Sequence, residues 1–232
     1  TNSDASTWAR RYASGSSRMD EMLHGTRSGR VWSPMSMQST TTFRSDESFT
    51  VRTFRRWVDS RPMSDVNHYE LVRGRIVMTP PAGWTHASLG ALIVGLLEVH
   101  VRRHRLGKVF DASLGYILPS GDVLEPDASF VSTRRFEANR PSRPNEYLRA
   151  VPNLVVEILS PGTAVRDRGE KKDLYEQGGV DEYWIVDSDH RAVTVFMAGP
   201  RGYGAGRTAI GGALRSRVLP KLRVSVAKLF QD

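Results

Sequence analysis

The sequence predicts an α/β protein built on a mixed β-sheet with helices on its faces. Apolar residues recur at helical spacing near residue 90, which predicts a long amphipathic helix. Residues 154–159 form an apolar run interrupted by one glutamate, which is typical of a strand covered on both faces. A further helix and a further strand follow this run, and elements that alternate in this way pack as layers around a sheet.

The composition fits one folded domain and favours a polyanionic partner. The chain has 232 residues, of which 39% are hydrophobic and 25% are charged. Its 33 Lys and Arg against 25 Asp and Glu give a formal net charge of +8, which attracts nucleic acid. Cysteine is absent, which excludes disulfide frameworks, thiolate zinc sites and cysteine nucleophiles.

The hydropathy pattern predicts neither a membrane span nor a secretion signal. The longest nearly apolar run, residues 91–97, is far shorter than the roughly 20 residues that cross a bilayer. No charged and then apolar leader opens the chain. We therefore expect a cytoplasmic protein that makes no membrane contact.

The chain divides into an extension and a domain. Residues 1–48 are rich in Ser, Thr and Arg and poor in aliphatic residues, so they bury too little apolar area to offset the entropy of ordering. They are expected to be a disordered extension, with an organellar transit peptide or a nucleic-acid-binding arm as alternatives. Residues 49–232 are expected to form the folded domain.

From residue 49 onward the expected elements follow one another closely. The helix near residue 90 is expected to be capped by Thr85 and to run to about Arg105. The other expected elements are, in chain order, a short helix ending near Pro62, a hairpin over 69–72 and 75–78, strands over 108–118 and 123–131, a loop over 134–152, a strand over 154–159, a helix over 167–177, a strand over 182–186 and a hairpin over 192–197 and 203–208.

Glu157 lies inside the apolar run, where a carboxylate costs several kcal/mol unless a cation or strong donors meet it. Asp127, near the start of the preceding strand, poses a milder form of the same problem. If the two strands are neighbours, the facing Cβ atoms lie about 5 Å apart. A divalent cation would relieve the repulsion, and oxygen ligands favour Mg²⁺ or Mn²⁺ over zinc. The alternative is a buried ion pair between Glu157 and an arginine.

Lys171 is the cation that the sequence brings to this acidic pair. It lies on the helix that follows Glu157, and Asp167, Lys171 and Tyr175 share one side of that helix at i, i+4, i+8 spacing. A lysine facing the carboxylates could position water and stabilise charge on a phosphoryl oxygen. The alternative is a solvated partner of Asp167.

Four stretches resemble the Uma-type family of restriction endonucleases, which belongs to the PD-(D/E)XK nuclease superfamily. The resemblance spans roughly residues 49–230 and rests on segments 69–86, 123–127, 151–171 and 175–187. It implies a restriction-endonuclease-like core with a four-stranded mixed central sheet, flanking helices and extra hairpins. It also implies a divalent-metal site and DNA as the substrate.

The resemblance also implies site residues. Asp127 matches the acid of the Pro-Asp element and Glu157 the acid of the second element, so both would hold Mg²⁺ or Mn²⁺, with the backbone carbonyl of Ile158 as a further ligand. Leu159 stands where lysine is usual in the superfamily. The family carries a lysine on the next helix instead, and Lys171 matches that position.

Two further polar positions match the family. Glu70 would hold a water molecule at the metal, and His86, in the first turn of a helix, could touch phosphate. The alternatives are an exposed hairpin glutamate and a histidine of the capping region.

The sequence therefore predicts a Mg²⁺-dependent endonuclease that hydrolyses phosphodiester bonds in DNA, either as a monomer or as a homodimer. One alternative is a catalytically inactive nuclease fold that binds DNA or assembles with other proteins. A second is a glycosidase that uses Asp127 and Glu157 as a carboxylate pair. Arginines in the 134–149 loop could contact a nucleic-acid backbone, whereas the i, i+4 pair His100 and His104 is surrounded by cations that disfavour zinc.

Overall fold

The computed structural model of the protein describes residues 43–231. Most of the predicted extension, residues 1–42, lies outside the described residues. Residues 43–48 belong to the same predicted extension, but Phe43–Arg44 form strand β1, which pairs with β3. An unpaired strand edge binds another extended segment readily, and β1 covers this edge of β3.

Helices and strands alternate along the described chain, as the sequence predicts. The helical segments are α2 (Val51–Asp59), α3 (Trp84–His104), α4 (Thr133–Ala138), α5 (Ala164–Arg166), the π-helical turn η2 (Asp167–Lys171), α6 (Lys172–Gly178) and α7 (Val226–Leu229). The remaining strands are β2 (His68–Val72), β3 (Arg75–Thr79), β4 (Gly107–Asp111), β5 (Tyr116–Ile117), β6 (Val123–Leu124), β7 (Ala128–Ser132), β8 (Leu154–Ile158), β9 (Glu182–Asp187), β10 (Ala192–Gly199), β11 (Gly202–Tyr203), β12 (Arg207–Ala209), β13 (Ala213–Arg215) and β14 (Arg223–Ser225).

The central sheet is mixed, which confirms the predicted class. Its strands are ordered β11-β10-β9-β8-β7-β4, with β12 also paired to β10. Strands β8 and β9 are parallel and the other pairs are antiparallel. The sheet has seven strands rather than the four expected, because the C-terminal hairpin extends it through β10 instead of standing apart.

The two strands expected over 108–118 and 123–131 are each divided between two sheets. Strand β4 pairs with β7 in the central sheet, whereas β5 pairs with β6 in a second sheet ordered β1-β3-β2-β6-β5. Pro126, which lacks an N–H, separates β6 from β7. Gly115 lies directly before β5, where the Tyr147 ring packs so closely that a Cβ atom would lie 2.5 Å from it, so this position accepts only glycine without a shift of the ring. The expected loop over 134–152 also contains α4, which sequence reasoning missed.

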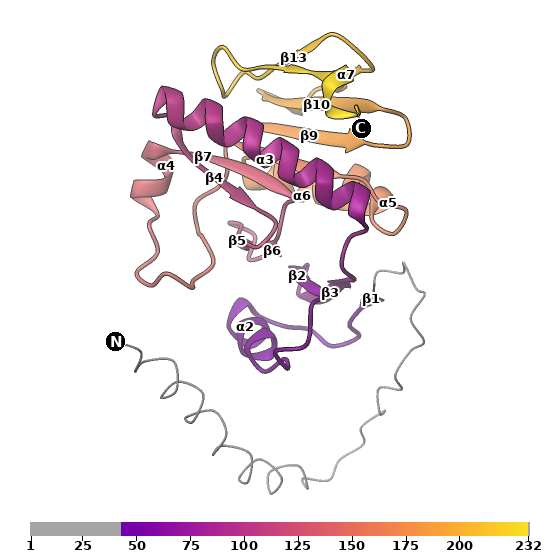
Figure 1. Ribbon diagram of the computed structural model, residues 1–232. Helices are drawn as coiled ribbons and strands as arrows, with labels where there is room; N and C mark the ends of the chain where they lie inside the picture. The colour runs from indigo at the N-terminus through magenta and orange to yellow at the C-terminus, as the bar shows by residue number, and fades with distance from the viewer. Residues whose placement is uncertain (1–42, 232) are drawn as a thin grey trace, which may run out of the picture. The chain divides into compact units, whose positions relative to one another are not determined.

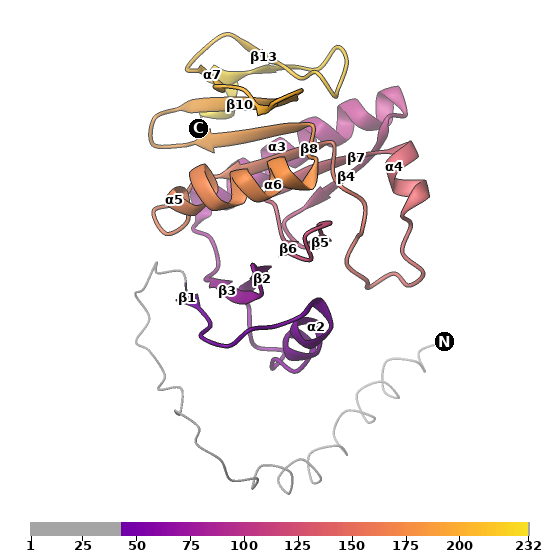
Figure 2. The same cartoon turned by 180° about the vertical axis from the view of Figure 1, so that it is seen from behind.

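Helices cover both faces of the central sheet. Helix α3 crosses one face (Figure 1), and α5 and α6 lie on the opposite face (Figure 2). Residues on one side of β8 and β9 pack toward α3, and those on the other side pack toward α6, with Leu174 and Tyr175. Alternate residues of a strand point to opposite faces. Glu157 therefore faces the α6 side, opposite to Val156.

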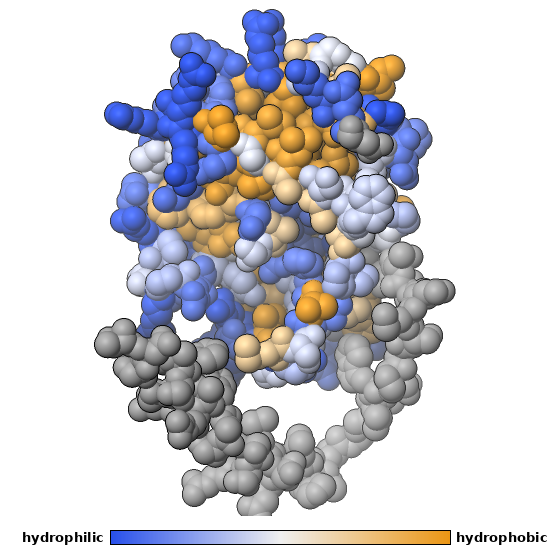
Figure 3. Space-filling view, viewed as in Figure 1, coloured by the Kyte–Doolittle hydropathy of each residue, from blue (hydrophilic) through white to orange (hydrophobic). Residues whose placement is uncertain are grey.

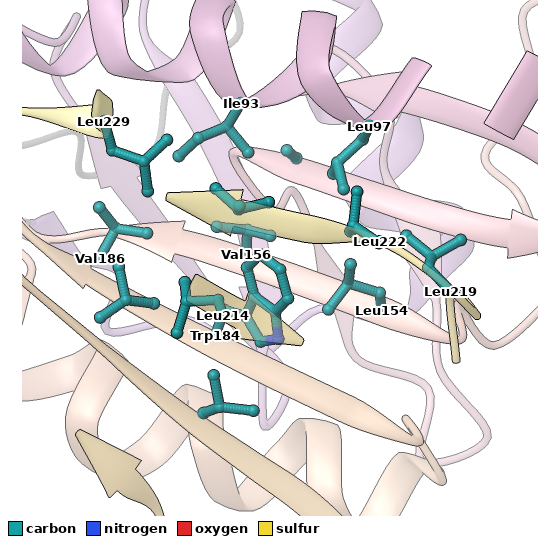
Figure 4. Packing of buried hydrophobic residues seen from close by; sticks show 14 of the residues in the cluster. Ile93, Leu97, Leu154, Val156, Trp184, Val186, Leu214, Leu219, Leu222 and Leu229 are labelled. Carbon is teal, nitrogen blue, oxygen red and sulfur yellow. The ribbon is translucent and has the colours of Figure 1, made fainter. Parts of the chain in front are cut away.

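Helix α3 begins two residues earlier than expected. Its N-cap is Gly83, which offers no side-chain hydrogen bond, and Thr85 lies inside the first turn. The prediction that Thr85 caps the helix was therefore wrong. By length and composition α3 is apolar enough to cross a membrane. Its inner side is nevertheless part of the protein core, where Ile93 and Leu97 pack against β8, β9 and the C-terminal residues (Figure 4).

Truncation of Leu97 tests this packing. Leu97 is 1% exposed, so the Leu97→Ala variant is expected to lose about 2–5 kcal/mol of unfolding free energy, as buried leucines do. The neighbouring Leu96 is 40% exposed, and Leu96→Ala should lose less than half as much. Urea denaturation followed by circular dichroism measures both losses. Equal losses in the two variants would contradict the assigned orientation of α3.

Candidate active site

The pairing of β7 with β8 brings the two predicted acids together. Ala128 lies opposite Val156 in this antiparallel pair, and continuing the register by one residue places Asp127 opposite Glu157. The backbone N–H of Ile158 donates a 2.7 Å hydrogen bond to Oδ2 of Asp127. The neighbouring-strand arrangement assumed from the sequence is therefore present.

Glu157 is almost fully buried and meets a lysine. Its Oε1 lies 2.6 Å from Nζ of Lys171 and accepts a 2.8 Å hydrogen bond from the Tyr175 hydroxyl. The helix side that carries Lys171 and Tyr175 therefore faces Glu157, as the sequence predicted. Lys171 is itself buried, so the alternative of a solvated partner of Asp167 was wrong. The alternative ion pair with an arginine was also wrong, because the cation at Glu157 is Lys171.

Glu70 joins the same cluster from the hairpin. Its Oε1 lies 2.9 Å from Nζ of Lys171 and accepts a hydrogen bond of 2.9 Å from the backbone N–H of Glu125. Its Oε2 lies 3.0 Å from Nη2 of Arg166. Glu70 is 3% exposed, so the alternative of an exposed hairpin glutamate was wrong. Lys171 therefore bridges two acids that are far apart in the sequence.

His86 approaches from the first turn of α3. Its Nε2 lies 3.2 Å from Oδ2 of Asp127, and it also hydrogen-bonds the backbone of Ile158. Although burial lowers the pKa of His86, the carboxylate of Asp127 outweighs it, and the pKa is raised. His86 thus contacts two of the three predicted metal ligands and does more than occupy the capping region.

Two functional candidates were not assigned from the sequence. Arg166 uses Nη2 for Glu70 and for the Thr79 hydroxyl, but its buried Nε and Nη1 have no hydrogen-bond partner among residues 43–231. Oδ1 of the buried Asp167 also has none within the described chain. The spacing from Lys171 pointed to the side of the helix on which Asp167 lies. In a chain this rich in arginine, nothing in the local pattern distinguished Arg166.

The helix that carries these residues contains a π-helical turn. Asp167–Lys171 form η2, between α5 and α6. A π-turn inserts an extra residue into the helix and commonly occurs at functional sites. The hydroxyl of Tyr183 donates to the backbone carbonyl of Asp167, which anchors this turn to β9.

The cluster contains more acidic than permanently basic side chains. Burial raises the pKa of Glu157 well above its ordinary value, and the charges of Asp127, Asp167 and Glu70 raise it further, against the opposing effect of Lys171. Burial likewise raises the pKa of Asp167. For Glu70 burial acts in the same direction, but Lys171 and Arg166 outweigh it and the pKa is lowered. The cluster has four carboxyl groups (Glu70, Asp127, Glu157 and Asp167) and two permanent cations, and a further cation would favour the charged forms of the two acids whose pKa is raised.

The donor set suits a hard divalent ion. Asp127, Glu157 and the Ile158 carbonyl offer oxygen atoms, and Mg²⁺ is commonly held by one or two carboxylates while it retains several waters. Oδ1 of Asp167, which has no hydrogen-bond partner among residues 43–231, is a further oxygen available to a cation. Within residues 43–231 no three Asp, Glu or His side chains form a preassembled metal-binding group. The residues therefore fit a partly hydrated Mg²⁺ or Mn²⁺ rather than a metal held entirely by side chains.

A cavity of about 810 Å³ gives access to these groups. Asp127, Glu157, Lys171, Arg166 and His86 all line it. The lining also includes the Pro80-Pro81 turn and the start of α3. The chemistry-bearing side chains thus line one cavity.

Arg135, from the arginine-rich 134–149 region, does not serve as a free phosphate contact. It donates to the backbone carbonyls of Val151 and Pro152 and pairs with Asp181 at 3.0 Å. Nε2 of His100 is 3.0 Å from the carbonyl of Pro220. These side chains hold loops in place.

The fold is of the class found in a solved structure that is described as a putative nuclease. The chain is similar to a solved structure from Anabaena variabilis ATCC 29413, described as a putative nuclease belonging to DUF820, with a TM-score of 0.64 and 19% identity over 78% of this chain and 97% of the other. The Uma2 family model, described as putative restriction endonuclease, matches residues 30–227. The chain belongs to the Uma2 family. No curated protein matches it.

Proposed function

We propose that this protein is a metal-dependent endonuclease that hydrolyses phosphodiester bonds in DNA. The supporting observation is the meeting of Asp127, Glu157 and Lys171 at one cavity, in a chain that belongs to a restriction endonuclease family. The net charge of +8 favours a polyanionic substrate.

Asp127, Glu157 and the carbonyl of Ile158 would hold Mg²⁺ or Mn²⁺. Such an ion supplies positive charge to the phosphoryl oxygens and lowers the pKa of a water molecule. Lys171 adds a fixed ammonium group beside Glu157, where it orients a water and stabilises charge that develops on the phosphate.

Two other residues act on the substrate in this proposal. Arg166 lines the cavity, and its Nε and Nη1 donors, which have no partner among residues 43–231, would bind a phosphate oxygen while its Nη2 stays anchored to Glu70. His86, which contacts Asp127, would touch the phosphate that lies at the metal ligands. Glu70 positions Lys171 and Arg166 through its two carboxylate oxygens.

Metal removal tests the proposed activity. Purified full-length protein is expected to convert supercoiled plasmid to nicked and linear forms in about 5 mM Mg²⁺ or Mn²⁺. It should show no cutting after the metal is chelated with EDTA. Gel electrophoresis of the plasmid measures the conversion. Cutting that persists in EDTA would show that the nuclease does not depend on a metal.

A catalytically inactive, DNA-binding form of the fold is the second candidate. It is supported by the ion pair between Lys171 and Glu157, because that pair satisfies the buried acid without a metal. Calorimetric titration with Mn²⁺ separates the two proposals. Binding that is lost in Asp127→Asn supports the enzyme, whereas DNA binding without any Mn²⁺ binding supports the inactive form. The fold and family favour either of these over a glycosidase.

A further inference from the structure

The outer face of α3 is apolar and exposed. Trp84 is 80% exposed, Val99 is 71% exposed, and Leu92 and Leu96 are each 40% exposed. The space-filling view shows apolar side chains gathered over α3 (Figure 3). A contiguous apolar patch of this kind on a folded domain marks an interaction surface.

Large and small residues alternate on this face in a symmetric way. Take the midpoint of the helix segment between Ile93 and Val94. Leu92 and Gly95 lie the same number of residues from this midpoint, one on each side. Three further pairs are placed in the same way: Ala91 with Leu96, Ser88 with Val99 and Trp84 with Arg103. Each pair combines a large side chain with a smaller one or, at the ends, an aromatic ring with a guanidinium group. A Cβ added at Gly95 would meet nothing within 4 Å, so this notch is open.

This pattern is complementary to itself. A second α3 laid antiparallel across the first, with a two-fold axis at that midpoint, would place each large side chain over the small member of its pair. Leu92 of one copy would enter the notch at Gly95 of the other. An isologous interface of this kind presents the same patch from both copies.

The charges at the two ends of α3 favour the same antiparallel arrangement. The last turn carries Arg102, Arg103 and His104, followed by Arg105. The first turn has no acidic or basic residue apart from His86, and it borders the cavity that contains Asp111 and Asp127. Antiparallel packing brings the basic end of each helix to the acidic cavity of the other copy, whereas parallel packing would place the basic ends together.

We propose that two copies of this chain form a dimer through the outer faces of α3, packed antiparallel about a two-fold axis between Ile93 and Val94. Arg103 of each copy then packs on Trp84 of the other as a cation–π pair. The same contact places basic side chains of each copy beside the cavity of the other, where a nucleic-acid backbone would pass. The dimer is independent of the proposed chemistry, although this last consequence rests on it.

Sedimentation velocity of the full-length protein tests the surface. The wild-type chain is expected to sediment as a dimer. Val99→Glu, at a site exposed in one copy but buried in the dimer, should raise the dimer dissociation constant by about 30-fold or more, the effect of removing an interface hot spot. Met63→Glu changes a side chain that is 97% exposed elsewhere and should leave the dimer unchanged. Circular dichroism confirms that both variants fold.

Disulfide crosslinking tests the direction of packing. The chain has no native cysteine, so only the introduced cysteines can form a disulfide. A mixture of Ser88→Cys and Val99→Cys should form a crosslinked heterodimer under mild oxidation. Each variant alone should not crosslink, because its own copies lie about 16 Å apart along an antiparallel pair and a disulfide requires Cα atoms within about 7 Å.

Three results would overturn the proposal. They are a wild-type chain that stays monomeric at about 100 μM, a dimer that Val99→Glu leaves intact, and crosslinking within the single variants in place of the mixture. A monomer that floats with phosphatidylglycerol vesicles, and loses this binding in Val99→Glu, would show that a lipid surface covers α3. None of these measurements requires nuclease activity, so the dimer and the proposed function fail or stand separately.

Discussion

Glu157→Gln is expected to abolish DNA cleavage and to leave the protein folded. Glutamine keeps the volume of the side chain and an oxygen that can accept from Tyr175, but it removes the charge that would bind the metal. Loss of the ion's effect on the transition state is expected to cost about 4 kcal/mol, or about a 10³-fold fall in the cleavage rate. The plasmid assay with Mg²⁺ measures the fall.

Matched variants make this result interpretable. Glu137→Gln changes a glutamate of α4 whose side chain is 53% exposed and pairs at the surface with Arg140, so it should cut at the wild-type rate. Asp127→Asn should fail in the same way as Glu157→Gln. If both acid variants cut as fast as the wild type, the activity would belong to a contaminant and the proposed enzyme would be wrong.

Lys171→Met is expected to destabilise the protein by about 3–5 kcal/mol at neutral pH. Lys171 is the cation between Glu70 and Glu157, and removing one partner leaves buried carboxylates that face each other. Lys172→Met, at the next position, breaks only partly exposed contacts with Asp173 and Glu176 and should cost less than about 1 kcal/mol. Urea denaturation of both variants gives the comparison.

The pH dependence of this loss has a definite sign. The pKa of Glu70 is lowered in the folded protein, since the charges of Lys171 and Arg166 outweigh the effect of burial. Its ion pairs therefore stabilise the fold above the ordinary pKa of a glutamate and lose that effect as the pH falls. The difference in unfolding free energy between the wild type and Lys171→Met should therefore become smaller as the pH is lowered. A difference in unfolding free energy that grows toward low pH would contradict the assigned role of Lys171.

The double variant Glu70→Gln/Lys171→Met refines the comparison. Removal of one carboxylate charge should restore part of the stability lost in Lys171→Met, because fewer unpaired charges remain buried. If the stability losses of Glu70→Gln and Lys171→Met simply add in the double variant, Glu70 and Lys171 do not interact. That result would contradict the ion pair indicated by the 2.9 Å distance between Oε1 of Glu70 and Nζ of Lys171.

Local patterns in the chain were sufficient to place the main parts of the site. The apolar run around Glu157 indicated a strand buried on both faces, and the structure has β8 at that position. The spacing of Asp167, Lys171 and Tyr175 indicated one helix side, from which Lys171 and Tyr175 both reach Glu157. Such inferences succeed because strand and helix periods are properties of neighbouring residues.

The partners of these residues across the fold required the tertiary structure. Nothing near Glu70 in the chain shows that it meets Arg166 and Lys171, since the hairpin and the helix are about 100 positions apart. The division of residues 108–131 between two sheets, and the growth of the central sheet to seven strands, depend in the same way on long-range pairing. Residue type and spacing specify which face of an element is buried, whereas only the assembled sheets decide which charges neutralise one another there.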